Sequence, residues 1–320
     1  MNEYVFKPKT NLSHAELQNR DLANTNLTEA RLYKTNFTKA NLTNAYLTKA
    51  NLTGANFSGA NLAGAYLIST QLDKQTYCDE HGCWIHPQFS IDFNGANLYG
   101  ANLADANLCE AKMCNVDATE AILVGTSLTS AVMTGANFTK ANFRCAVAGH
   151  AELTGSNLAY ANVQEAEFMY ANLDHTNLSH STGYRTCFCH SYANAANFDY
   201  AELPFAHFVH SSLSNSQFIG ADLSYADLDH AVIRESNLTG TILNHAKITN
   251  AFLNSSNFTD ADLTGADLTG TDLTNTDLTR ADLTYADLTR ANLTGTNLSD
   301  ANLHYATMTA AIMPDGTVHE

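Results

Sequence analysis

A strict five-residue period runs through almost the whole chain. We call the large apolar residue the centre of each repeat; centres fall at every fifth position from Leu12 to Leu72 and again from Phe93 to Met313. Leu or Phe fills 47 of these 58 centres, and Ala, Ser or Thr stands two residues before the centre in 55 of them. Asn or Asp dominates the position just before the centre, as in ADLTGADLTGTDLTNTDL. The fold must therefore bury one large apolar residue in every five.

This period excludes a long helix and favours short extended segments joined by bends. A helical apolar stripe needs spacings of three and four, whereas a step of five rotates the stripe around the axis. In an extended segment, the small residue and the centre lie two apart and share one face. The next inward residue is three further on, so a bend must absorb the extra residue, and Asn, Asp, Gly, Ser and Thr supply turn chemistry there. A chain that bends at regular intervals coils on itself and buries its centres inside.

The repeat resembles the A(D/N)LXX motif of the pentapeptide-repeat family over roughly residues 10–313. The resemblance implies an all-β fold, a right-handed quadrilateral parallel β-helix with four pentapeptides in each coil. With 58 repeats this means about 14 coils and a length of about 70 Å at about 4.8 Å per coil. The final segment AAIMPDGTVHE is similar to the ending of cyanobacterial members.

The period divides the chain into five segments. We expect an N-terminal cap over residues 1–9, repeat coils over 10–72, an inserted loop over 73–91, further coils over 92–313 and a C-terminal tail over 314–320. Across the insertion, successive centres lie 21 residues apart instead of five. We interpret this spacing as a loop that takes about one coil's length of chain and shifts the register by one residue.

The inserted loop contains four side chains of the types that bind zinc. They are spaced Cys78-x2-His81-x-Cys83-x2-His86, which is tighter than the usual paired blocks of zinc ligands. A Cys78–Cys83 disulfide is a second interpretation. The third is a loop without metal that Trp84 and its apolar neighbours hold against the coils, where it contacts a partner. The spacing alone leaves all three open.

If 20 residues make a coil, residues 20 apart become vertical neighbours. One outward corner then carries a column of rings, with a shorter apolar run beside it: His150, Tyr170, His190, His210 and His230, next to Met169, Cys189 and Val209. The column is either an exposed stack without function, a metal site built from imidazoles, or a strip that docks a protein partner. We select eight residues as candidates for partner binding. They are Met169, Tyr170, Cys189, His190, Val209, His210 and His230 of this corner, and Trp84 of the loop.

Charge and composition narrow the function. A formal net charge of −16 argues against direct nucleic-acid binding, which requires Lys and Arg. No phosphate-binding loop, nucleophile elbow or HExxH motif appears, so we expect no enzyme, no catalytic residue and no cofactor. The seven cysteines fit a reducing compartment, and we see neither a signal peptide nor a membrane span, so we expect a cytoplasmic protein.

Two functions remain. The first is a non-catalytic rod that acts as a protein-interaction, scaffold or regulatory module for an unidentified protein partner. The second follows from the resemblance, because some members of the family imitate DNA, bind DNA gyrase and give quinolone resistance. Against it, the net charge is roughly one per 4.4 Å of expected length, compared with about one per 1.7 Å for B-DNA.

Overall fold

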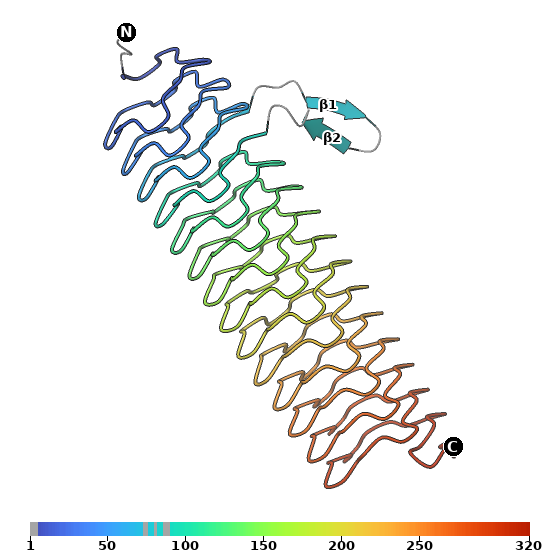
Figure 1. The fold of residues 1–320 in the computed structure, drawn as a ribbon. Helices are drawn as coiled ribbons and strands as arrows, with labels where there is room; N and C mark the ends of the chain where they lie inside the picture. The colour runs from blue at the N-terminus through green and yellow to red at the C-terminus, as the bar shows by residue number, and fades with distance from the viewer. Residues whose placement is uncertain (1–5, 73–75, 80–81, 86–89) are drawn as a thin grey trace. The chain divides into compact units, whose positions relative to one another are not determined.

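The computed structural model describes residues 6–72, 76–79, 82–85 and 90–320, and the chain divides into two compact units, Met1–Asn162 and Val163–Glu320. Within these ranges there is no helix; apart from one hairpin, turns alternate with single-residue β-bridges. Most of the bridges are parallel and join residues 20 apart, as Asn11 with Arg31 in the first unit and Glu167 with Cys187 in the second. Four pentapeptides therefore make each four-sided coil, and Figure 1 shows these coils stacked within each unit.

Each N–H group of a typical pentapeptide has its own acceptor. In residues 40–44, the small residue donates across the turn to the preceding centre (2.8 Å), and the next two residues donate to the coils on either side (2.9 and 2.7 Å). The fifth residue also donates to the following coil (2.9 Å). The fourth, Thr43, donates to the side-chain Oδ1 of Asn41 at 3.2 Å. Asn or Asp before the centre thus completes the hydrogen bonding of the backbone, which a buried or half-buried chain requires.

The core of each unit consists of centres stacked one coil apart. In the second unit Phe188 lies between Phe168 and Phe208, with ring centroids 5.4 and 4.8 Å apart. Phe198 meets this stack edge-on, at 5.9 Å from Phe188. The undersized centre Gly183 leaves no void, because a Cβ placed there would come within 2.4 to 2.7 Å of neighbouring side chains. Larger neighbours therefore fill the space that a small centre releases.

A hairpin interrupts the coils of the first unit. Strand β1 (Thr76–Asp79) pairs antiparallel with strand β2 (Gly82–Ile85), and the backbone register places Cys78 opposite Cys83. In Figure 1 the two strands project beside the coils, at the change from blue to green.

The coils resume after the hairpin without a change of register. Asn56 pairs with Asp92, 36 residues later instead of 20, and the rings of Phe57 and Phe93 stack at 5.1 Å. Phe93 therefore takes the place that the residue five after Leu72 would have had. The expected loss of one coil's length and the one-residue shift are wrong: the extra chain is inserted between two consecutive sides of one coil. Stacking of identical sides restores the register, because any shift would turn the centres outward.

The C-terminal segment folds back on the last coil of the second unit. Ile312 pairs antiparallel with Val318, and the N–H of Met313 donates to the carbonyl oxygen of Thr317 at 2.7 Å. Asp315 closes this turn by accepting from both the N–H and the hydroxyl of Thr317, at 3.0 and 2.7 Å. Reversing the strand direction covers part of an edge that could otherwise pair with another chain.

Candidate functional site

The corners of the coils determine which side chains reach solvent. From Leu12 to Met308, the second residue after each centre adopts a left-handed conformation wherever it is described, with φ between 51° and 61° at the 43 non-glycine positions. Most side chains at this position are exposed. Because the corner recurs every 20 residues, side chains at one corner form a column along the unit.

One corner of the second unit carries four stacked rings, which we call the imidazole column: Tyr170, His190, His210 and His230. Successive ring centroids lie 4.9, 5.1 and 4.8 Å apart, with interplanar angles of 10°, 19° and 12°. These distances match the spacing of paired strands, so the backbone itself sets the stacking distance. His190 is partly exposed and the other three residues are exposed.

The preceding corner of the same coils carries a second stack, which we call the aromatic column: Phe205, Tyr225 and His245. Its centroids lie 4.9 and 5.0 Å apart, and Tyr184 meets Phe205 edge-on at 5.3 Å. Phe205 and Tyr225 are 37% and 49% exposed, which is unusual for rings of this size. The two columns border one side of the coils, which we call the ring face.

Cysteine and histidine lie between the two columns. Cys187 and Cys189 flank the buried centre Phe188, and Cys187 is bridged to His207 in the next coil. At Cys187 and His207 the ring face lacks the Asn or Asp that elsewhere accepts the N–H of the residue two further on. The sequence interpretation included Cys189 and missed Cys187 and His207. The motif CFC was the available signal, because residues two apart in an extended segment point to the same side.

Towards its C-terminal end the ring face becomes charged. Lys247 Nζ lies 3.6 Å from a carboxylate oxygen of Asp227 and 3.4 Å from one of Asp229. The hydroxyl of Thr249 donates a hydrogen bond to the Asp229 carboxylate. One cation faces two carboxylates, so this end of the ring face is acidic.

The structure brings most of the sequence-predicted residues onto one face. Met169, Cys189 and Val209 lie on the side next to the imidazole column, as the 20-residue coil predicts. His150 belongs to the first unit, and the rings described here begin at Tyr170. Trp84 lies in strand β2, where the structure describes the backbone only. The role of all these candidate residues in binding a partner stays a prediction.

The proposed metal sites have different outcomes. The residues of the imidazole column are all described, and within the described ranges no three His, Cys, Asp or Glu side chains are arranged to hold a metal ion. His81 and His86 of the loop lie outside those ranges, so the zinc interpretation of Cys78, His81, Cys83 and His86 stays a prediction.

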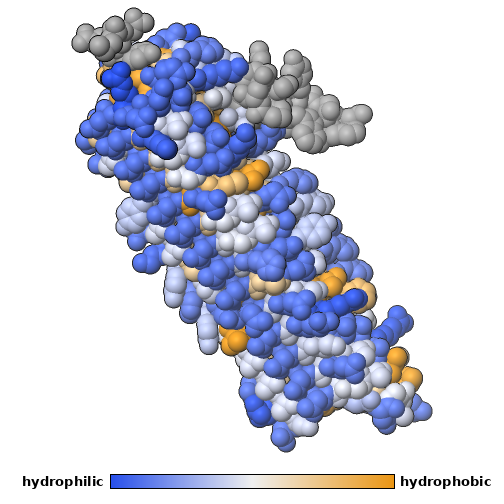
Figure 2. Space-filling model, viewed as in Figure 1, coloured by the Kyte–Doolittle hydropathy of each residue, from blue (hydrophilic) through white to orange (hydrophobic). Residues whose placement is uncertain are grey.

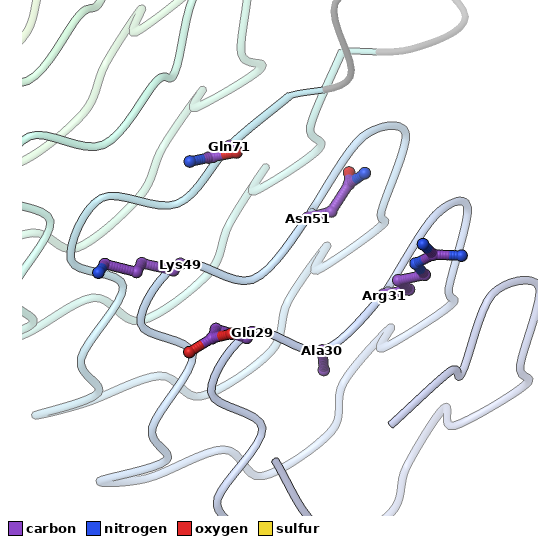
Figure 3. Close-up of a pocket in the computed structure, with 6 residues that line it drawn as sticks. All are labelled: Glu29, Ala30, Arg31, Lys49, Asn51 and Gln71. Atoms are coloured by element: carbon purple, nitrogen blue, oxygen red, sulfur yellow. The ribbon is translucent and has the colours of Figure 1, made fainter. Parts of the chain in front are cut away.

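The surface also contains shallow depressions in the first unit. The larger, of about 490 Å³, is lined by Glu29, Ala30, Arg31, Lys49, Asn51 and Gln71. Figure 3 shows Arg31, Asn51 and Gln71 on successive coils, with Glu29 and Lys49 in a row beside them. Charges of both signs spread along an open wall do not form the converging, enclosed set of groups that catalysis needs.

The face of the molecule in the space-filling view (Figure 2) is mainly polar. Figure 2 shows one face of the molecule, where hydrophilic residues predominate and hydrophobic residues form separate small areas. Over the part of the chain that can be described, no helix is both long and apolar enough to cross a membrane.

Comparison with protein families supports the repeat assignment. The pentapeptide-repeat model matches eight copies over residues 10–48, 40–74, 91–129, 115–147, 149–182 and 276–313, and a pentapeptide-repeat-region model matches 211–288. No curated protein matches the chain.

Several solved structures are similar to this chain. HetL, a pentapeptide repeat protein involved in heterocyst differentiation regulation from the cyanobacterium Nostoc sp. strain PCC 7120, is 26% identical; the match covers 84% of this chain and 93% of HetL with a TM-score of 0.24. QnrB1, a plasmid-mediated fluoroquinolone resistance protein, is 17% identical over 61% of this chain and 90% of its own, with a TM-score of 0.28. A pentapeptide repeat protein from the Arabidopsis thaliana thylakoid lumen is 34% identical; the match covers 31% of this chain and 65% of that protein, with a TM-score of 0.18.

Proposed function

Because the chain belongs to the pentapeptide-repeat family, we propose that it is a non-catalytic β-helical module that binds another protein through the ring face of its second unit. The observation that carries this proposal is the pair of exposed ring columns at neighbouring corners, from Tyr170 to His230 and from Phe205 to His245. Exposed aromatic groups in a continuous patch are typical of interaction surfaces.

Backbone preference does not explain the rings. Each stands in the left-handed conformation, which glycine adopts without strain and which costs other residues about 1–2 kcal/mol. Glycine occupies the same turn position at Gly220, Gly240 and Gly265. The same conformation recurs at corners that carry other residue types, so the repeat does not require rings at these positions.

The partner follows from the chemistry of the ring face. Flat aromatic and imidazole rings favour guanidinium groups stacked on them, and the carboxylates of Asp227 and Asp229 at the acidic end attract cations. The protein as a whole has a net charge of −16. We therefore propose a partner segment that carries Arg and Lys.

A capture experiment with matched surface variants tests this proposal. The full chain carrying Tyr170→Ala, His190→Ala and His210→Ala should bind its captured partner at least tenfold more weakly than the native chain. The control is His180→Ala with Tyr200→Ala, which removes a similar exposed stack (5.2 Å) at another corner. Equal binding by all three proteins, or equal loss in both variants, would exclude the ring face.

A second candidate function is imitation of DNA towards DNA gyrase. Asp262 is bridged to Asp282, and Asp267 to Asp287, so like charges lie one coil apart. Each accepts the N–H two residues later, for example from Thr264 at 3.0 Å, a bond that neutral Asn makes elsewhere. The choice of Asp adds charge that the turn does not require. A supercoiling assay with purified gyrase tests this candidate, and no inhibition or quinolone protection at micromolar protein would exclude it.

We extend the proposal to the remaining architecture. We propose a right-handed coil, about 14 coils in all, in a cyanobacterial-type member of the family, with a regulatory or scaffold role in the cytoplasm. The segment boundaries we propose are 1–9, 10–72, 73–91, 92–313 and 314–320. The family resemblance supports the hand of the coil, and the repeat count supports the number of coils.

A further inference from the structure

We propose that Cys187 and Cys189 form a redox-active dithiol that exchanges with low-molecular-weight disulfides, with Cys187 as the attacking thiol. This modification site goes beyond the proposed docking function and does not depend on it. Neither cysteine belongs to the inserted loop, where the sequence first suggested cysteine chemistry.

The two cysteine side chains leave the coil next to each other at an accessible place. Cys187 and Cys189 stand on either side of the buried Phe188, so both side chains leave the coil on the same side. Both are free thiols that are partly exposed, two residues apart in one segment of the coil. The backbone around them is held in place, since the Cys187 N–H donates to Ala166 at 2.9 Å and the Cys189 carbonyl accepts from Tyr170 at 3.1 Å.

The contact between the thiols differentiates them. The hydrogen bond from Cys189 lowers the pKa of Cys187 to about 7 against opposing desolvation, whereas the same contact raises the pKa of Cys189. Because the thiolate is the nucleophile, Cys187 is prepared to attack and Cys189 to act second.

Charged and titratable groups of both signs surround the pair. Glu167 lies in the coil before Cys187 and His207 in the coil after it, with Asp227 one coil further. In the same coil Arg185 and His190 stand at the two corners. The Cys189 sulfur lies 3.8 Å from the carbonyl oxygen of His207.

The exchange proceeds in two balanced steps. The Cys187 thiolate attacks one sulfur of a small disulfide such as oxidised glutathione, forming a mixed disulfide and releasing one thiolate, which takes a proton from water. Cys189 then loses its proton to water and attacks the Cys187 sulfur, forming the Cys187–Cys189 disulfide and releasing the second small thiolate, which takes a proton from water. Two protein thiols are oxidised and one small disulfide is reduced to two thiols.

Oxidised glutathione is the probe for the test. The full native chain is incubated with it at pH 7, free thiols are alkylated, and each cysteine is identified by peptide mass spectrometry. We expect a Cys187–Cys189 disulfide without bound glutathione in the native chain, and a glutathione adduct trapped on Cys187 in the Cys189→Ser variant. Alkylation of Cys187 in the untreated protein should be roughly fivefold faster than that of exposed Cys145, since the higher thiolate fraction outweighs its lower nucleophilicity.

The Cys187→Ser variant is the matched control, and its thermal unfolding is compared with that of the native chain to confirm folding. It should form no disulfide at Cys189 and gain no glutathione there. The proposal is overturned if adducts distribute equally over Cys109, Cys145 and Cys187, or if no Cys187–Cys189 disulfide forms in the native chain. The alkylation rates of Cys187 and Cys145 in the native protein test the proposal without any variant: equal rates would also overturn it.

Discussion

At the scale of the residue, one side-chain oxygen in each turn completes the backbone. Turn chemistry in general explains why Asn and Asp are common in the repeat, but their position just before the centre has a narrower cause. From there Oδ1 accepts the N–H two residues later, as Asn142 does from Arg144 at 3.1 Å. A net hydrogen bond of this kind stabilises by about 0.5–1.5 kcal/mol, and the repeat makes it many times.

Asn142→Ala should therefore loosen a single turn. Removing the acceptor leaves the Arg144 N–H dependent on water, so its hydrogen exchange should become about two- to tenfold faster. Hydrogen exchange followed by mass spectrometry or NMR on the full chain measures this change. Asn142→Asp keeps the oxygen and is the control; if both variants exchange alike, the side-chain bond does not protect the turn.

At the scale of the element, one coil is a layer whose volume depends on the layers beside it. Gly183 occupies a centre, and a Cβ there would lie 2.7 Å from Leu203 and Val163 and 2.4 Å from the Thr186 hydroxyl. The structure shows a site already filled by its neighbours, where close packing penalises added atoms as well as removed ones.

Gly183→Ala should consequently destabilise the second unit by about 1–3 kcal/mol. Leu203→Ala removes one of the groups that a Cβ at position 183 would meet, but it leaves a cavity, and we expect it to destabilise the unit by about 2–5 kcal/mol. The double variant should lose less than the sum of the two, because each change relieves the other. Thermal unfolding of all three variants measures the coupling, and simple additivity would show that Leu203 does not restrict position 183.

At the scale of the whole molecule, charge links stability to pH. The hydrogen bond from the Thr279 hydroxyl lowers the pKa of Asp277, and that from Thr317 lowers the pKa of Asp315. A carboxylate whose pKa is lowered in the folded state contributes stability above its unfolded pKa, and this contribution is lost as the pH falls through the folded value.

Stability should thus decline as the pH falls below about 4, the ordinary pKa of Asp. The Asp277→Asn variant keeps an acceptor for the Thr279 N–H, which lies 2.9 Å away, and cannot titrate. Its thermal midpoint should match that of the native protein at pH 7 and fall less steeply below pH 4. If the thermal midpoints of the two proteins fall equally steeply below pH 4, Asp277 does not contribute to the pH dependence.

The sequence by itself determined the period, the inward residues and the family, because burial in a five-residue repeat is a local property of each segment. Within the repeats of residues 10–72 and 92–313, the direction of a side chain, inward or outward, depends only on its distance from its own centre. The 20-residue column of rings was predicted as well, once the family resemblance supplied four repeats per coil.

Tertiary structure decided what depends on neighbouring coils. It placed Phe93 on Phe57 across the inserted hairpin, where a count of residues predicted a shifted register. It also placed the carbonyl oxygen of His207 3.8 Å from the Cys189 sulfur, a contact between coils that the repeat by itself did not identify. The physical reason is that the register of one coil on the next depends on the burial of all its centres and the pairing of all its N–H groups together. A single pentapeptide does not determine these interactions between coils.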